Sequence, residues 1–390
     1  MKKKLLYFSL FTIPMILMSL HLEINSINLA DVIILIYFFI LIYSVSKNKE
    51  LLIIIRGNNQ YFYLYIIWIL IVLVRGTIYN FSTEEGILGN ILIQNYVGYI
   101  DDRTAFMNFF RIDSSETHLL TFIRLVLAMV VYYIGVYFAN KINGTIPYIK
   151  LGLLLSIVIN VILSLEQLIL DNRASGLLGH AQDLSSLGLM YIALEITEKK
   201  KNYIGIFLAV IAIYFSETRS AYFAFVLLLL TVYFENVNIP KITILGTLIS
   251  TLIVSFFIDA KQFILNIIGF ITDPWDLMIR FELWSKVFAE ISIKNLFFGA
   301  NLFPSFTDNI IWYIVMPTGY IGLFLFIMMF IKDAKIAKRG NNVFKQNFIV
   351  ILFGQGLLFN GFLGEYTIFM WFFIYGIIYK SESMENRNLE

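Results

Sequence analysis

Long apolar runs alternate with short polar turns along almost the whole chain. Crossing the hydrocarbon core of a bilayer takes about 20 helical residues, and a crossing segment must be helical so that its backbone groups stay paired. The pattern therefore predicts an all-α protein with about 12 transmembrane helices. Their expected positions are 5–22, 28–46, 61–80, 118–139, 148–170, 184–197, 203–217, 219–234, 242–259, 310–331, 345–363 and 366–380.

Two of these runs, 203–217 and 219–234, are separated by almost nothing. Such spacing predicts either a tight helical hairpin or one span that is partly re-entrant. The residue at the tip of this turn is Arg219.

Composition agrees with a membrane protein rather than a soluble one. Hydrophobic residues make up 59% of the chain and charged residues only 14%, whereas soluble domains average roughly 45–50% and about 25%. Residues 1–390 are expected to form a single integral membrane domain. The absence of cysteine excludes disulfides and thiolate metal sites, and a net charge of +2 gives no nucleic-acid footprint.

Basic residues indicate the orientation, because they concentrate in alternate loops, as the positive-inside rule describes for cytoplasmic loops. The rule places both termini in the cytoplasm and favours an even number of spans. The basic residues of this face are Lys2, Lys3, Lys4, Lys47, Lys49, Arg56, Lys141, Lys150, Lys199, Lys200, Lys201, Lys241, Lys332, Lys335, Lys338, Arg339, Lys345, Lys380 and Arg387.

The largest outer loop is expected at 260–309. Within it Asp273 and Pro274 form a start signal for a helix, and apolar residues then recur at helical spacing. We predict an amphipathic helix over 274–292 that lies along the outer leaflet.

Arg173 is one of three arginines that fall on the outer face, against the trend of the other basic residues. It opens the motif Arg173-x-x-Gly176-x-x-Gly179-His180-x-x-Asp183. Glycine allows close backbone approach to a ligand, arginine offers a planar fork for phosphate, and histidine exchanges protons near neutral pH. The alternative is a flexible turn whose arginine reaches lipid headgroups.

Arg219 and Arg280 are the other two outer arginines. Glu217 is two residues from Arg219, and side chains at that spacing do not face each other on a helix, so Arg219 needs a distant carboxylate or a ligand as partner. Arg280 lies on the amphipathic helix, one turn from Trp284. Snorkelling to the interface and stacking on tryptophan are the respective structural alternatives.

Asp308 and Asn309 close the large loop just before the tenth predicted span. A carboxylate there could orient an acceptor hydroxyl, or it could cap the helix that follows. Arg75 is expected to snorkel from the outer end of its span. The chain has no P-loop and no serine-hydrolase elbow, and we expect neither a metal nor another cofactor.

Several segments resemble the O-antigen polymerase and O-antigen ligase superfamily. They are Arg173-x-x-Gly176 with His180, Ser216–Ala221, Arg280–Trp284, Phe297–Gly299 with Asp308-Asn309, and Pro317–Leu323. The resemblance covers roughly 150–380. Ligases of this family often carry histidine in the large loop before the next span, where this chain has Asp308-Asn309, and that difference favours a Wzy-type polymerase.

The resemblance implies a metal-independent membrane glycosyltransferase of GT-C-like fold, which joins oligosaccharide units carried on undecaprenyl diphosphate at the outer face of the bacterial plasma membrane. Arg173, Arg219 and Arg280 would bind the diphosphate, and Asp308 or His180 would activate the acceptor. Its partners would be the lipid-linked substrate and membrane lipids, with a chain-length regulator and a flippase as further candidates.

Two other functions stay open from the sequence. A ligase would transfer finished glycan to another acceptor, and a flippase or transporter would move the lipid-linked oligosaccharide across the membrane.

Overall fold

The computed structural model describes a helical protein. The described residues are 7–14, 23–24, 27–28, 36, 39, 43, 60–78, 115–141, 144–170, 176, 178, 181–234, 237–256, 297–299, 309–357 and 367–378. Of the five candidate site residues only Arg219 is among them. Arg173, His180, Arg280, Asp308 and the helix expected at 274–292 lie outside the described residues.

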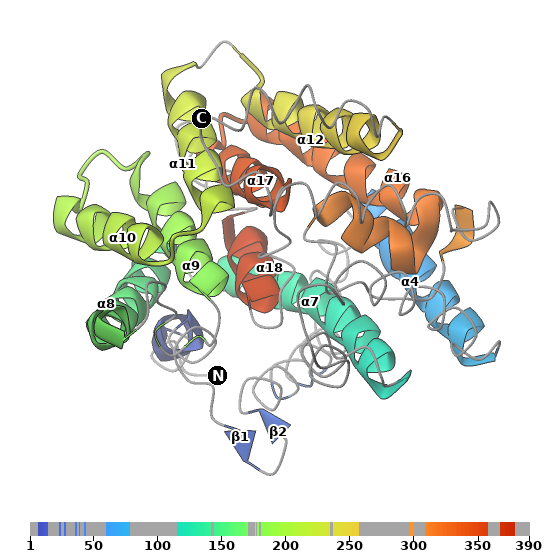
Figure 1. The fold of residues 1–390 in the computed structure, drawn as a ribbon, viewed down its shortest axis with the longest axis horizontal. Coiled ribbons are helices and arrows are strands. Elements are labelled where there is room, and N and C mark those ends of the chain that lie inside the picture. Colours follow the sequence, from blue (N-terminus) through green and yellow to red (C-terminus); the bar gives the residue numbers. More distant parts are fainter. Residues whose placement is uncertain are drawn as a thin grey trace.

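The helices follow the apolar runs closely (Figure 1). They are α4 Gln60–Ile78, α7 Ser115–Lys141, α8 Ile146–Leu170, α9 Ala181–Glu195, α10 Tyr203–Phe215, α11 Arg219–Tyr233, α12 Ile239–Phe256, α16 Ile310–Arg339, α17 Val343–Gly356 and α18 Thr367–Ile378. Apart from a short antiparallel pair of two residues each, β1 Glu23–Ile24 and β2 Ile27–Asn28, every element that the structure describes is helical, which confirms the all-α expectation.

One helical segment among the described residues, Ile146–Leu165 of α8, is both long enough and apolar enough to cross a bilayer. Other apolar helices are shorter, including Tyr203–Phe215 and Arg219–Tyr233. The described residues thus confirm a helical protein with at least one candidate span, and the expected number of spans remains a prediction.

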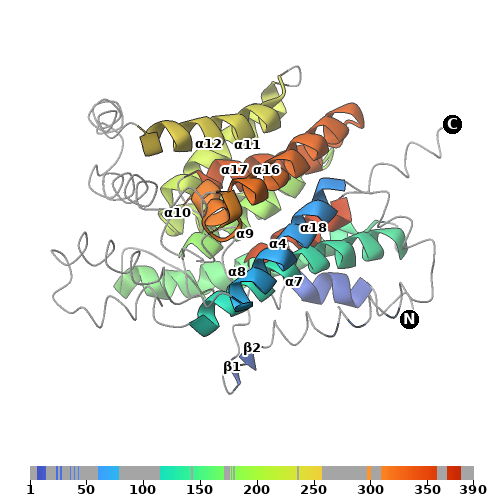
Figure 2. The same cartoon turned by 90° about the vertical axis from the view of Figure 1, so that its right-hand side faces the viewer.

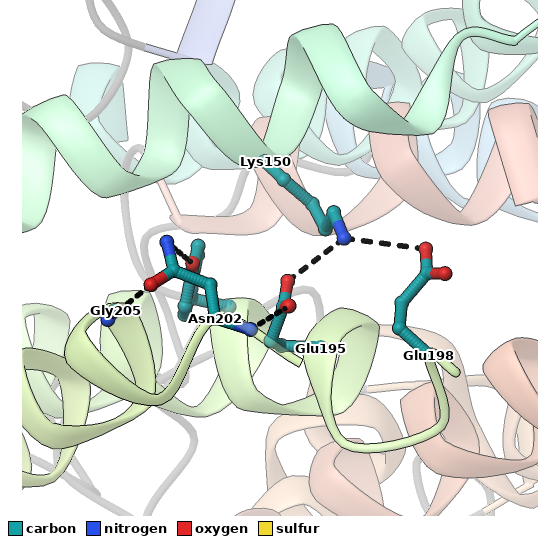
Figure 3. Close-up of polar contacts among 6 residues, drawn as sticks. Lys150, Glu195, Glu198, Asn202 and Gly205 are labelled. Atoms are coloured by element: carbon teal, nitrogen blue, oxygen red, sulfur yellow. Dashed lines mark hydrogen bonds and ion pairs between the residues drawn. The ribbon is translucent and has the colours of Figure 1, made fainter. Parts of the chain in front are cut away.

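Lysine-rich turns from different parts of the chain meet at one end of the helical bundle. The Lys150 Nζ atom at the start of α8 lies 2.8 Å from a carboxylate oxygen of Glu195, at the end of α9, and 3.2 Å from one of Glu198. Asn347, in the first turns of α17, donates to the Ala193 carbonyl. Figure 3 shows Lys150 between the two glutamates. We call this the lysine-rich end.

The starts of α9 and α18 meet the end of α17 at the opposite end of the bundle. Thr367, the first residue of α18, donates a hydrogen bond to Asp183 in the first turn of α9, and Ser186 of α9 bonds Gln355 at the end of α17 at 3.0 Å. Neighbouring helices α9 and α17 therefore run antiparallel. Figure 2 shows α12 along one side of the bundle and α7 and α8 along the other.

The outward surfaces of several helices are apolar. On α10 the side chains of Tyr203, Ile204, Phe207 and Tyr214 are exposed, at spacings that place them on one face. Polar side chains such as Asn160 are instead buried between helices. Water-facing helices show the reverse distribution, so these faces are compatible with contact to lipid.

Helix α16 is broken in its N-terminal half, which the expectation of a simple span at 310–331 missed. Gly319 has φ 68° and ψ −177°, a conformation almost restricted to glycine. A Cβ at Gly319 would collide with the backbone of Phe297, and the indole of Trp68 donates to the Thr318 carbonyl at 2.7 Å. The remainder of α16 continues to Arg339, beyond the predicted boundary.

Lys345 was expected on the cytoplasmic face with the other lysines, after the tenth span. It is a buried residue in the first turn of α17, and its Nζ atom lies 3.0 Å from a carboxylate oxygen of buried Asp333 on α16. The Tyr375 hydroxyl of α18 donates to the same oxygen at 2.8 Å. This pair holds three helices together at the lysine-rich end.

Candidate functional site

The turn between α10 and α11 is short because polar side chains satisfy its backbone. Ser216 donates to the Ile213 carbonyl at 2.7 Å, and Thr218 donates to the Ser216 carbonyl at 3.1 Å. Glu217, between them, adopts a positive φ of 48°, which lets the chain change direction within three residues. The sequence left a tight helical hairpin and a partly re-entrant span open. In the described chain α10 packs on α8 and α9 whereas α11 packs mainly on α17, so the two helices diverge from this turn and do not pack together as a tight hairpin (Figure 1).

Arg219 is the first residue of α11 and its side chain is exposed. No ion pair joins it to Glu217 or to any other carboxylate in the described part of the chain. The expectation that Glu217 is not its partner therefore agrees with the described contacts. An exposed guanidinium at a helix start is available to an external anion.

The turn between α10 and α11 lies at the end of the bundle opposite to the lysines. Near its start α10 is beside Tyr191, close to the lysine-rich end, and further on Ile213 lies beside Gly188. Helix α11 then passes α17 with Ala224 against Gly354, next to Gln355. Arg219 thus belongs to the same end as Asp183 and Gln355, which we call the Arg219 end.

Gly176, the central glycine of the arginine motif, is fixed to α8 by a side-chain amide. Gln167 Nε2 donates to the Gly176 carbonyl at 3.0 Å, while its Oε1 accepts from the Gly176 N–H at 2.8 Å. The φ of Gly176 is +62°, and a Cβ there would meet Asn160. Gly176 is required both for this conformation and for this close approach.

Asp183, the last residue of the same motif, was not assigned a role from the sequence. It is 8% exposed and accepts a hydrogen bond from Thr367. Gln355 lies on the neighbouring helix, bonded to Ser186, and is fully buried. Both Asp183 and Gln355 could have been singled out from the sequence, because polar side chains inside apolar segments are costly and commonly functional.

Asn309 caps α16, which answers part of the question left open for Asp308-Asn309. Its Oδ1 accepts from the backbone N–H groups of Ile311 and Trp312, and its Nδ2 donates to the Leu357 carbonyl at 2.7 Å. Asn309 is therefore a structural residue, and the role of Asp308 stays a prediction.

Arg75, which was expected to snorkel to the membrane interface, forms hydrogen bonds within the protein. Its guanidinium donates to the carbonyls of Phe298 and Gly299 at 3.1 and 3.2 Å. Through these bonds α4 holds the Phe297–Gly299 segment.

No group of three or more His, Cys, Asp or Glu side chains is placed to hold a metal within the described ranges. No family model, no curated protein and no solved structure matches the chain. The functional assignment consequently depends on the residues and contacts of the chain itself.

Proposed function

We propose that this chain is a polytopic plasma-membrane glycosyltransferase that polymerises oligosaccharide units carried on a lipid diphosphate. The observation that carries the proposal is the position of Arg219. It is an exposed arginine without a carboxylate partner in the described part of the chain, on the end of the bundle opposite to the lysine-rich turns.

Membrane embedding is supported by surface and charge together. Exposed apolar side chains cover the outer faces of α4, α8 and α10, and lysines gather at the other end from the Arg219 turn. Under the positive-inside rule the lysine-rich end faces the cytoplasm. The proposal accordingly has about 12 transmembrane helices, cytoplasmic termini and an outward-facing Arg219 end, in a GT-C-like arrangement.

The chemistry requires stabilisation of a diphosphate leaving group. In the proposed step a sugar hydroxyl oxygen of one unit attacks the anomeric carbon of another, the bond from that carbon to the lipid diphosphate breaks, and the hydroxyl proton passes to a base. Arginines stabilise the charge that develops on the diphosphate. Arg219 would act there with Arg173 and Arg280, and Asp308 or His180 would accept the proton.

Replacement of Arg219 in the native host tests the proposal. Arg219→Ala is expected to abolish polymer and to accumulate single units on the lipid, and Arg219→Lys to restore only part of the polymer because lysine lacks the planar fork. Arg339→Ala is the matched control, since Arg339 is an exposed arginine at the end of α16, on the lysine-rich end. Polymer of normal length in Arg219→Ala, at normal protein level, would refute the proposal.

Product analysis separates the other functions. Loss of a ligase would leave finished polymer on the lipid, and loss of a flippase would leave units at the cytoplasmic face. Purified protein that converts lipid-linked units to polymer without an energy source would be a polymerase.

A further inference from the structure

Three consecutive lysines at residues 199–201, which we call the lysine triplet, are exposed in the turn between α9 and α10. The acidic residues of the same turn are already occupied, because Lys150 of α8 lies 2.8 Å from a carboxylate oxygen of Glu195 and 3.2 Å from one of Glu198 (Figure 3). No ion pair joins the triplet to a carboxylate in the described part of the chain. The charges of the triplet are therefore open to an anion outside the protein.

The backbone of this turn is held in place by Asn202, the residue that follows the triplet. Its N–H donates to one carboxylate oxygen of buried Glu195 at 2.6 Å, while the other oxygen pairs with Lys150. The side-chain amide of Asn202 donates to the Tyr191 hydroxyl at 3.3 Å, and its side-chain oxygen accepts from the Gly205 N–H at 3.0 Å. The triplet is thus presented by a turn that is fixed to both of the helices it joins.

The face of α10 that continues from the triplet is apolar and exposed. Tyr203, Ile204, Phe207 and Tyr214 are its main side chains, and their spacing keeps them on one side of the helix. With 13 residues, α10 is about 20 Å long, whereas one leaflet contributes roughly 15 Å of hydrocarbon. A molecule on this surface would meet cations beside the start of α10 and an apolar strip along the rest of the helix.

We propose that the lysine triplet and the exposed face of α10 form a binding site for an anionic phospholipid, in the leaflet at the lysine-rich end. The triplet contacts the lipid phosphate, and the strip that includes Tyr203 and Phe207 contacts the acyl chains. Basic residues at a membrane surface attract anionic headgroups, and the adjoining apolar strip favours a lipid over a soluble anion or an acidic protein. The site lies at the other end of the bundle from Arg219, so the inference requires a membrane-embedded chain but not the proposed catalytic step.

Native mass spectrometry of the full-length protein in detergent, titrated with phosphatidylglycerol or with zwitterionic phosphatidylcholine, tests the site. One basic residue near an anionic lipid contributes about fivefold in affinity. The unmodified chain should therefore bind one phosphatidylglycerol about a hundredfold more tightly than phosphatidylcholine. Replacement of the whole triplet by glutamine should remove this preference, and each single lysine-to-glutamine variant should weaken binding about fivefold. Equal affinity of the unmodified chain for the two lipids would overturn the proposal.

A second triple variant separates a defined site from the general positive charge of this end. Lys241 on α12 and Lys335 and Arg339 on α16 are exposed, and their joint replacement by glutamine removes the same three charges. This control should keep the preference for phosphatidylglycerol. An equal loss of preference in both triple variants would mean that the charge of this end attracts the lipid without a defined site, and it would overturn the proposal.

The apolar half of the site is tested by Phe207→Ala, which should weaken phosphatidylglycerol binding about threefold because less apolar surface covers the acyl chains. Phe324→Ala is the matched control, since Phe324 is an exposed phenylalanine on α16, away from α10 (Figure 1). Equal weakening by the two variants would overturn the placement of the acyl chains on α10. Soluble glycerol phosphate should not displace the lipid, and displacement at equal concentration would identify a site for phosphate alone.

Thermal unfolding without added lipid shows whether the variants are folded. The substituted side chains are all exposed, so Tm should be close to that of the unmodified chain. If the triplet variant is unfolded, the three single lysine variants give the same test, and unchanged phosphatidylglycerol affinity in all three would overturn the site.

Discussion

The side-chain amide of Gln167 binds the backbone of Gly176 through two hydrogen bonds, of 3.0 and 2.8 Å. This pair joins the end of α8 to the segment that leads into α9, within the motif that begins at Arg173. Because a side-chain amide carries an N–H₂ donor group beside a carbonyl acceptor, it can pair with both backbone groups of a single residue. The predicted diphosphate ligand Arg173 is therefore only three residues from a fixed point.

Gln167→Glu should reduce polymer formation by about tenfold or more, since a misplaced binding group commonly costs this much. The substitution keeps the shape but replaces the donor with a second oxygen that faces the Gly176 carbonyl. Chain-length analysis of the glycan, with protein level and Tm measured in parallel, checks this expectation.

Thr243→Val is a suitable control for Gln167→Glu, because among the described residues the Thr243 hydroxyl bonds within its own helix alone, to the Ile239 carbonyl at 2.9 Å. Normal polymer in both variants would show that the fixed position of Gly176 is not needed.

The buried pair of Lys345 and Asp333 predicts strong non-additivity. Both residues are 1% exposed, so removal of one leaves an uncompensated buried charge, at a cost of about 3–5 kcal/mol. Lys345→Met and Asp333→Asn should each lower Tm sharply, whereas the double variant should recover much of the loss. Thermal unfolding of the four proteins in one detergent measures the coupling.

Lys335→Met controls for loss of a lysine as such, since Lys335 lies near Asp333 on α16 but is exposed. It should change Tm little. Additive losses in the double variant would mean that the ion pair does not link α16 to α17.

Sidedness can be tested directly because the chain contains no cysteine. Glu217→Cys, exposed in the turn between α10 and α11, should react with a membrane-impermeant maleimide in intact cells or spheroplasts. Lys200→Cys, exposed in the turn between α9 and α10, should react only after permeabilisation. The reverse pattern would place Arg219 in the cytoplasm and remove the basis for an outer-face reaction.

Local features of this protein could be predicted from its sequence, but the hydrogen bonds between residues far apart in the chain could not. Helix positions followed from apolar runs, and the separation of Arg219 from Glu217 followed from their spacing. The bond between Asp183 and Thr367 joins residues 184 positions apart, and one sequence holds no information on which distant polar residues meet. The same holds for Ser186 with Gln355. Hydropathy also cannot distinguish a continuous helix from one that is broken at Gly319.

Two glycine-to-alanine substitutions should have opposite effects on stability. At Gly319 the backbone lies in a region that alanine rarely adopts, and the new methyl would collide with the backbone of Phe297. Gly319→Ala should therefore cost about 2 kcal/mol or more. Gly246, inside α12, has open space around its Cα, so alanine there should stabilise by about 0.5–1 kcal/mol through helix propensity.

The comparison isolates the effect of the break in α16, because the chemical change is the same in both variants. Thermal unfolding in detergent gives the two shifts in Tm, and limited proteolysis reports whether the Phe297–Gly299 segment, which Arg75 holds, becomes accessible. Faster cleavage near this segment in Gly319→Ala alone is expected, since the collision displaces that backbone first. If both variants gain stability, α16 continues as a regular helix through Gly319. The close contact between Gly319 and the Phe297–Gly299 segment is then not part of the folded protein.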